Sequence, residues 1–321
     1  MLRFALTFLA IVLATPAPAG TIDTLAVPSI ALERSIPVTV YRPDGPPPDG
    51  GWPVLYLLHG LGGDEKSWLT LGQIRDTLNR LIDDGTIDPL LVVMPAAGNS
   101  WYVNSRPIGG PGDYESVIAV DLLTFIEGRY PVRSDGGGRA IAGLSMGGYG
   151  ALRIGLSYPQ RYAAIASLSG ALWQNVPEAD LDKPPNELDL ISKSKWFHRI
   201  DPATIVPDVD VPPPGTHFAT AFGDPFDARF FNRMNVFTAV AKTMRDGNPI
   251  PPVYLTVGDR DDHGLWKGTF ALFETMRAEN GPATLRVTGG RHSWDLWRSS
   301  IKDALSFVDR NFKMEATGQT R

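Results

Sequence analysis

Apolar residues in this chain form short continuous runs, and longer stretches with helical spacing separate them. The runs at residues 53–58 and 89–94 are almost wholly apolar, as expected for parallel strands that helices cover on both faces. Between them, residues 72–84 carry apolar side chains three or four positions apart, which predicts an amphipathic helix. This order is typical of a strand–helix–strand unit.

The same alternation continues towards the end of the chain. It predicts further strands at residues 36–41, 139–142, 162–168, 252–257 and 283–287, and further helices at residues 114–130, 148–156, 228–244, 266–278 and 293–311. We therefore expect a doubly wound α/β fold, in which a mostly parallel sheet has helices on both faces.

Residues 171–251 interrupt this rhythm. The stretch is rich in proline and contains a single predicted helix. We interpret it as an inserted cap or loop region over the sheet, and a poorly ordered excursion is the alternative.

The first residues differ in composition from the rest of the chain. Arg3 precedes an apolar run at residues 4–13, and Ala17-Pro18-Ala19 offers a small-residue cleavage site. The apolar run is shorter than the roughly 20 residues that a transmembrane helix needs. We predict a signal peptide at residues 1–19 and a single domain at residues 20–321, periplasmic or secreted and without stable membrane insertion.

Composition and charge narrow the chemistry and the partners. The 321 residues include no cysteine, which excludes disulfides and a thiolate nucleophile. The formal net charge of −5 and the lack of a Lys/Arg stripe argue against nucleic acid as a partner. The chain has neither a nucleotide-binding glycine motif nor the ligand spacing of a calcium site, so we expect no cofactor and no metal.

The segment Gly143-Leu144-Ser145-Met146-Gly147 follows a predicted strand and precedes a predicted helix. In that context the G-x-S-x-G pattern is typical of a nucleophile elbow, a sharp turn that lifts a serine hydroxyl clear of the sheet. Ser145 is therefore the candidate nucleophile. Its hydroxyl needs a base to accept the proton and an acid to hold that base.

The base is expected to be a histidine on a loop after a later strand. His292 fits, because it follows the last predicted strand and precedes the last predicted helix. His198 and His217 lie in the interrupted region, where a surface or structural role is commoner. His263 is either an ordinary loop residue or part of the pocket wall.

The acid is expected in the turn after the strand at residues 252–257, where three aspartates lie close together. We choose Asp261, with Asp262 and Asp259 as the alternatives. The two aspartates that do not hold the base are expected to cap the following helix. Metal binding by the three carboxylates is the rival interpretation.

A tetrahedral intermediate also needs two preorganised hydrogen-bond donors. The backbone N–H of Met146, directly after the nucleophile, supplies one. The glycine-rich segment His59-Gly60-Leu61-Gly62-Gly63 follows the strand at residues 53–58, and it predicts Leu61 N–H as the second donor and His59 as a scaffold residue.

Several of these segments, in this order, resemble the putative-esterase family of α/β-hydrolases, which includes S-formylglutathione hydrolases, feruloyl and acetylxylan esterases, and mycolyltransferases. The resemblance covers residues 36–312. The segments that carry it are His59-Gly60-Leu61-Gly62-Gly63, Val92-Val93-Met94-Pro95, Gly143-Leu144-Ser145-Met146-Gly147-Gly148, the turn at residues 258–262, and Gly289-Gly290-Arg291-His292-Ser293-Trp294.

The resemblance implies an α/β-hydrolase fold and assigns the site. It implies a triad of Ser145, Asp261 and His292, and an oxyanion hole made by the N–H groups of Leu61 and Met146. The preference for Asp261 also rests on the spacing from Gly258, which matches the acid turn of the family.

Two aromatic pairs lie near these motifs. Asn99-Ser100-Trp101-Tyr102 resembles a segment that borders the active site in these relatives, so Trp101 and Tyr102 are candidate substrate contacts, with simple packing as the alternative. Trp294 and Trp297, beside the proposed base, are expected in the core rather than at the substrate.

The resulting hypothesis is an exported serine carboxylesterase with an acyl-enzyme on Ser145, acting on a small-molecule or polysaccharide-linked ester. A mycolyltransferase-like acyltransferase would use the same residues, with an alcohol in place of water. The third possibility is a binding protein that keeps the fold without activity. The sequence makes no prediction of oligomeric state.

Overall fold

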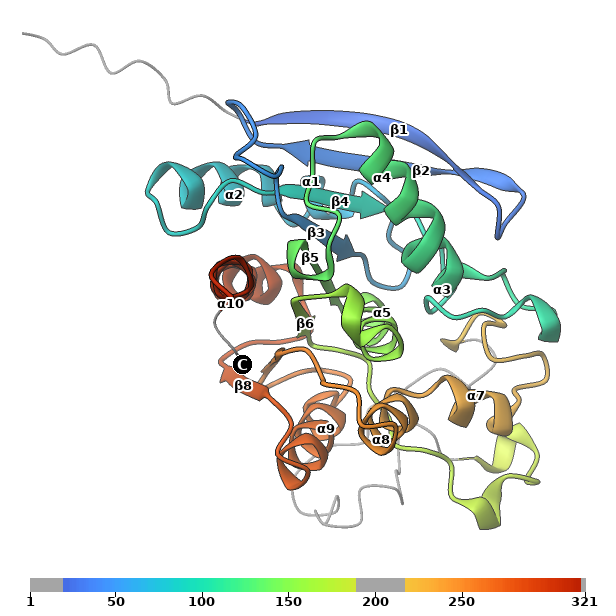
Figure 1. Cartoon of the computed structure of the whole chain (residues 1–321). Coiled ribbons are helices and arrows are strands. Elements are labelled where there is room, and N and C mark those ends of the chain that lie inside the picture. Colours follow the sequence, from blue (N-terminus) through green and yellow to red (C-terminus); the bar gives the residue numbers. More distant parts are fainter. Residues whose placement is uncertain (1–19, 189–216, 319–321) are drawn as a thin grey trace, which may run out of the picture.

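The computed structural model describes residues 20–188 and 217–318, so the predicted signal peptide and His198 lie outside the described residues. Within these ranges, eight strands form one sheet in the order β1-β2-β4-β3-β5-β6-β7-β8. The pairs β1–β2 and β2–β4 are antiparallel, and all other neighbours are parallel. The mostly parallel sheet with helices on both sides (Figure 1) confirms the predicted fold class.

The central strands are short and fully buried, as their continuous apolar runs predict. The strands are β1 (Thr21–Ser29), β2 (Arg34–Arg42), β3 (Val54–Leu58), β4 (Leu91–Pro95), β5 (Arg139–Leu144), β6 (Ala164–Leu168), β7 (Val253–Gly258) and β8 (Ala283–Thr288). Strand β1 was not predicted. It is an edge strand with mostly exposed or half-buried side chains, so its apolar signal is weak.

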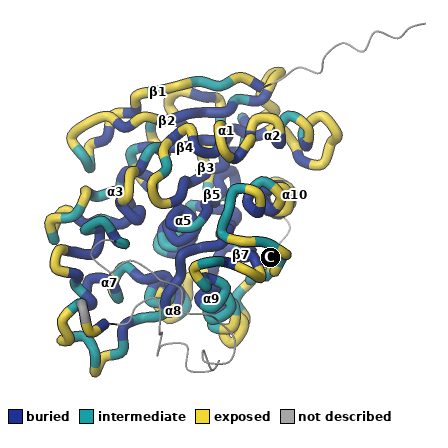
Figure 2. Tube along the Cα trace, turned by 180° about the vertical axis from the view of Figure 1, so that it is seen from behind, coloured by how far each residue is buried: buried dark blue, intermediate teal, exposed yellow. Residues whose placement is uncertain are grey.

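Two layers of helices bury the two faces of the sheet. Leu55 and Leu57 of β3 pack with α1, α2 and α10, whereas Tyr56 points to the face covered by α4, α5, α8 and α9. Figure 2 shows the buried residues along the strands and α5. The helices are α1 (Ser67–Thr70), α2 (Ile74–Asp83), α3 (Tyr114–Ser116), α4 (Leu123–Arg129), α5 (Met146–Ser157), α7 (Ala228–Met234), α8 (Val236–Arg245), α9 (Trp266–Ala278) and α10 (Trp294–Ala316).

One helix prediction needs correction. The helix expected at residues 228–244 is two helices, because Asn235 adopts an extended backbone between α7 and α8. The Asn235 side chain accepts a hydrogen bond from Phe237 N–H and donates one to Trp173 O. Asparagine side chains often cap helix ends in this way. The apolar spacing of residues 228–244 does not change at Asn235, which is why the pattern predicted one helix.

The described part of residues 171–251 packs against the α/β fold through helices α7 and α8. Helix α8 packs on α5, and Thr243 Oγ1 donates a hydrogen bond of 2.7 Å to Leu156 O. Tyr149 of α5 donates a 2.6 Å hydrogen bond to Met234 O at the end of α7. These contacts place α7 and α8 beside α5, the helix that follows Ser145.

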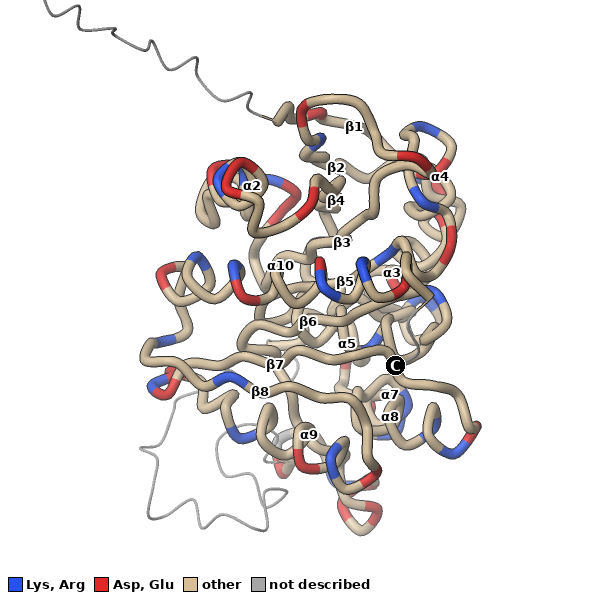
Figure 3. Tube along the Cα trace, turned by 60° about the vertical axis from the view of Figure 1, so that its left-hand side comes forward, with Lys and Arg blue, Asp and Glu red and all other residues tan. Residues whose placement is uncertain are grey.

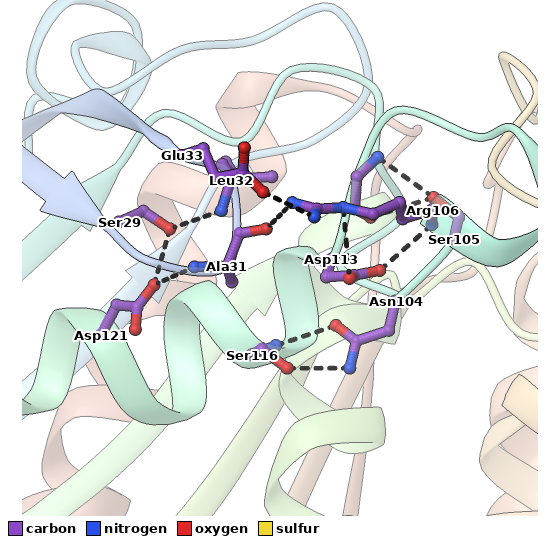
Figure 4. Close-up of polar contacts among 11 residues, drawn as sticks. Ser29, Ala31, Leu32, Glu33, Asn104, Ser105, Arg106, Asp113, Ser116 and Asp121 are labelled. Atoms are coloured by element: carbon purple, nitrogen blue, oxygen red, sulfur yellow. Dashed lines mark hydrogen bonds and ion pairs between the residues drawn. The ribbon is translucent and has the colours of Figure 1, made fainter.

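The long loop between β4 and α3 is tied to the turn between β1 and β2 (Figure 4). Arg106 forms a 3.0 Å ion pair with Glu33, and its backbone N–H donates to Asp113 Oδ1. Exposed ion pairs add little stability, but these contacts fix the position of the loop. Trp101 and Tyr102 lie in this loop, so its anchoring helps to set where both rings lie.

The start of α5 lies against the end of β3 with no room for a side chain. A Cβ atom at Gly147 would lie 2.5 Å from His59 O and 2.6 Å from Leu58 O. We expect Gly147→Ala to lower the free energy of unfolding by roughly 1–3 kcal/mol, because one of two packed backbone segments must shift. Urea denaturation would measure this change.

Gly128 provides a matched control for that substitution. It lies in α4, and a Cβ atom there would meet nothing within 4 Å. Gly128→Ala should therefore be neutral or stabilising, by up to about 1 kcal/mol, because alanine favours the helix. Equal effects of the two substitutions would contradict the close approach at Gly147.

Candidate active site

Ser145 occupies a strained turn between β5 and α5. Its backbone has φ 53° and ψ −118°, a conformation that costs free energy in a residue with a Cβ. Hydrogen bonds from Ser145 N–H to Leu168 O and from Ala171 N–H to Ser145 O hold the turn. A Cβ atom at Gly143 would lie 2.2 Å from Gly147 O, so the glycines of the motif are required by close packing.

His292 lies in the loop between β8 and α10 and connects the serine to an acid. Its Nε2 atom is 3.0 Å from Ser145 Oγ, and its Nδ1 atom is 2.8 Å from Asp261 Oδ2. Because an ionised carboxylate only accepts, Nδ1–H donates to Asp261, which leaves Nε2 to accept from the serine hydroxyl. Trp297 is buried and packs edge-on against the His292 ring at 4.9 Å between centroids. Trp294 and Trp297 nevertheless both line the pocket at Ser145, which the expectation of a core position away from the substrate did not include.

The Asp261 carboxylate is enclosed by its own turn. Its side chain has no exposed surface. Besides the His292 ring, the carboxylate accepts hydrogen bonds from His263 N–H at 3.0 Å and from Leu265 N–H at 3.3 Å, both through Oδ1. These bonds fix the orientation of the carboxylate, and a fixed carboxylate can hold the His292 ring in one orientation.

The two neighbouring aspartates hold the loop that carries His292. Asp259 Oδ1 accepts a 2.8 Å hydrogen bond from Gly290 N–H, which lowers the pKa of Asp259. Asp262 pairs with Arg291, which lowers the pKa of Asp262, and also accepts from His292 N–H. The expectation that these aspartates cap the next helix was wrong, because the N-cap of α9 has no side-chain hydrogen bond.

The backbone N–H groups of Leu61 and Met146, near Ser145, have no hydrogen-bond acceptor in the described part of the chain. Met146 is the first residue of α5, where the helix dipole is positive. Leu61 lies in the loop after β3, and a 2.8 Å hydrogen bond from Gly62 N–H to Asn99 Oδ1 holds this loop. Two free, preorganised N–H donors beside the serine are suited to bind an oxyanion.

His59 is buried behind this loop and ties it to two other segments. Its Nδ1–H donates to Gly60 O at 2.8 Å, and its Nε2 accepts from Ala97 N–H at 3.0 Å. Burial lowers the pKa of His59, in keeping with a neutral ring. Tyr102 donates from its hydroxyl to His59 O and is fully buried behind the pocket wall. Its position therefore does not support the predicted substrate contact.

We expect His59→Ala to reduce both stability and turnover. The substitution leaves the buried Ala97 N–H without its acceptor, which costs about 1–3 kcal/mol of unfolding free energy. It also frees the loop that positions Leu61, so kcat for a nitrophenyl ester should fall by up to about 10²-fold. His59→Gln keeps a donor and an acceptor and should lose less. Equal kcat in His59→Ala and the wild type would contradict this positioning role.

The hydroxyl of Ser145 opens into a pocket of about 410 Å³ whose described lining holds no Lys, Arg, Asp or Glu. Lys, Arg, Asp and Glu residues occur mainly on the outer helices and loops (Figure 3). Burial lowers the pKa of His217 in this pocket to about 4, so that ring is neutral at neutral pH. The rings that line the pocket, besides His292, are Trp101, Trp173, His217, His263, Trp294 and Trp297.

No group of three His, Cys, Asp or Glu side chains in residues 20–188 and 217–318 is arranged to hold a metal ion. Within the same ranges, no helix is both long and apolar enough to cross a bilayer.

A mostly parallel sheet with a serine at the sharp turn after a central strand is the architecture of the α/β-hydrolases. A family model described as "Putative esterase" matches residues 29–308, and the chain belongs to this family. It is a hydrolase that acts on carboxylic ester bonds.

Similarity to individual proteins agrees with the family. The acetyl esterase of Caldicellulosiruptor saccharolyticus is 25% identical over 256 residues, which cover 80% of this chain and 83% of that protein. An endo-1,4-beta-xylanase/feruloyl esterase of Xylanibacter ruminicola is 36% identical over 123 residues, 38% of this chain and only 17% of that protein. Among solved structures, a ferulic acid esterase matches with a TM-score of 0.67 at 24% identity, over 92% of this chain and 99% of that one.

Proposed function

We propose that the protein is an exported serine carboxylesterase that works through an acyl-enzyme on Ser145. The observation that carries the proposal is the row of hydrogen bonds from Asp261 through His292 to Ser145, at 2.8 and 3.0 Å. A serine hydroxyl in such a row can lose its proton as it attacks, which an isolated serine cannot do at neutral pH.

Acylation begins when Ser145 Oγ attacks the ester carbonyl carbon and its proton passes to His292 Nε2. The carbonyl oxygen becomes an oxyanion, which the N–H groups of Leu61 and Met146 stabilise. The Asp261 carboxylate stabilises the imidazolium. When the intermediate collapses, the ester C–O bond breaks and Nε2–H gives its proton to the leaving alcohol oxygen.

Deacylation repeats these steps with water. His292 Nε2 accepts a proton from water while the water oxygen attacks the acyl carbon, and the bond to Ser145 Oγ then breaks as Oγ regains a proton. The products are a carboxylic acid and the free enzyme. An alcohol in the place of water would give a new ester, so the same residues would serve an acyltransferase.

The pocket favours uncharged substrates with an apolar part. It contains no ionised carboxylate, lysine or arginine among its described lining residues, and its rim includes Leu61 and Leu71, which are 44% and 49% exposed. Exposed leucines beside a pocket fit an apolar group of a ligand. Together with the acetyl and feruloyl esterases among the relatives, this supports a short or aromatic acyl group on a small-molecule or polysaccharide-linked alcohol.

The proposal of export rests on the signal-like composition of residues 1–19. The position of Gly20 supports it. Gly20 N–H donates to Asn79 Oδ1, and Gly20 O accepts from Arg75 Nε, both at 3.0 Å, so the folded chain is anchored at the residue after the predicted cleavage site. Amino-terminal sequencing of protein from the periplasm or medium should give Gly20 as the first residue. Protein that keeps residues 1–19 and stays in the cell interior would contradict export.

A panel of nitrophenyl esters from acetyl to octanoyl, with a feruloyl ester, tests the activity. We expect the wild type to hydrolyse some of these esters and Ser145→Ala to hydrolyse none measurably. The dependence of the rate on acyl chain length then measures the size of the acyl pocket. The same panel with added alcohol separates the alternatives, because a new ester among the products identifies a transferase. Folded protein that hydrolyses none of these esters would contradict the esterase proposal and favour a binding protein.

A further inference from the structure

His263 is an imidazole in the pocket that the steps above do not use. It lines the same pocket as Ser145 and His292, and its ring lies edge-on to that of His292, with 4.9 Å between centroids and 84° between planes. Its backbone N–H donates to Asp261 Oδ1 at 3.0 Å. The turn that holds the acid therefore also fixes where this second imidazole lies.

The ring nitrogens of His263 have no hydrogen-bond partner among the residues that the structure describes. The residue is exposed, so its ring nitrogens can exchange water for a ligand. Partial desolvation in the pocket, together with the neighbouring His292, lowers the pKa of His263, although Asp261 and Asp262 act in the opposite direction. The ring is therefore neutral at neutral pH and offers one donor and one acceptor.

The chemistry of the ester reaction decides which part of the substrate lies beside this ring. His292 Nε2 must give its proton to the leaving oxygen, so that oxygen lies within hydrogen-bond distance of Nε2. The carbonyl oxygen lies elsewhere, at the N–H groups of Leu61 and Met146. The ring next to His292 is thus on the side of the leaving alcohol.

We propose that His263 is a specificity-determining residue that hydrogen-bonds a free hydroxyl next to the ester oxygen of the leaving alcohol. A hydroxyl both donates and accepts, which matches a neutral imidazole. The substrate class is an ester of an alcohol with two or more hydroxyl groups, and a pocket lining without ionised carboxylate or amine fits such a neutral alcohol. The inference rests on the proposed function, because it uses the direction of proton transfer.

Two esters with one acyl group test the role of His263. Ethyl butyrate and 2-hydroxyethyl butyrate differ in a single hydroxyl on the leaving alcohol. We expect the ratio of kcat/KM for the hydroxyethyl ester to that for the ethyl ester to fall by roughly 2- to 12-fold in His263→Phe, which corresponds to one neutral hydrogen bond. His263→Gln should keep part of the ratio, because its amide can donate and accept. The intrinsic reactivities of the esters cancel when variant and wild type are compared.

The ratio also protects the test against a partly unfolded variant, since both esters are measured on one preparation. His217→Phe is the matched control. It removes another pocket imidazole, whose Nε2 is enclosed and whose ring contacts Trp101, tilted by 50°, instead of His292. That variant should keep the wild-type ratio.

Three results would overturn the inference. An unchanged ratio in His263→Phe overturns it and leaves the proposed function standing, provided that turnover still depends on Ser145. A ratio lost in His217→Phe and kept in His263→Phe moves the contact to the other imidazole. Hydrolysis of both esters that persists in Ser145→Ala removes the proposed function together with the inference.

Discussion

Ser145→Ala is expected to lower kcat for every ester that the enzyme hydrolyses by a factor on the order of 10⁵ to 10⁶. Without Oγ no acyl-enzyme forms, and His292 Nε2 has no hydroxyl to accept from. The donors at Leu61 and Met146 would remain, so a small residual rate above that in water is expected. Initial rates at saturating nitrophenyl ester measure the effect.

The loss should be one of chemistry and leave the fold intact. Alanine keeps the Cβ atom that the turn already accommodates at φ 53°, so the unfolding temperature should change little. A serine-reactive organophosphorus probe should add one adduct mass to the wild type and none to the variant. Adduct formation in Ser145→Ala would show that the nucleophile lies elsewhere.

Ser167→Ala provides the control for this experiment. Ser167 lies in β6, which pairs directly with β5, and its buried Oγ has no hydrogen-bond partner in the described ranges. Removing such an atom should leave turnover close to that of the wild type. Similar losses in both variants would mean that serine substitutions near the elbow act through packing.

Sequence patterns predicted the parts of the site whose structure depends on neighbouring residues or on the order of strands and helices. The glycines around Ser145 are required by contacts between neighbouring turns, so the motif alone indicated a conformation that the backbone adopts. His292 could be chosen because the β/α order places the loop after the last strand at the same edge of the sheet as the elbow. Fully buried strands gave continuous apolar runs, whereas the exposed edge strand β1 gave almost no signal.

The missed features depend on tertiary positions. Trp101 and Tyr102 are adjacent and both have positive φ, yet one ring lines the pocket and the other lies behind it. His217 enters the pocket wall only because the chain returns there, where its ring packs against Trp101 and edge-on against Trp173. No periodicity along the chain encodes such returns, because the distance in sequence between the contacting rings is large.

Three aspartates follow β7, and the sequence alone favours Asp261 as the acid while leaving Asp259 and Asp262 as alternatives. Asp261→Asn should lower kcat by about 10⁴-fold, because an amide that donates to Nδ1 selects the tautomer with a proton on Nε2. In that tautomer His292 cannot accept the proton of Ser145. The Asn side chain keeps the shape of Asp, so its oxygen still has the N–H of Leu265 and His263 within reach and the turn should stay folded.

Asp259→Asn and Asp262→Asn should be much milder, because the amide oxygen can still accept from the backbone N–H groups of Gly290 and His292. We expect losses of no more than about tenfold, since weakened loop contacts shift the ring without changing its tautomer. The pH profile of kcat separates the two kinds of damage. A misplaced ring lowers the whole profile. With the wrong tautomer in Asp261→Asn, activity should instead rise only at high pH, where hydroxide can take the proton of Ser145 in place of Nε2. A larger loss in Asp262→Asn than in Asp261→Asn would mean that Asp262, which here holds the loop around His292, is the acid of the triad.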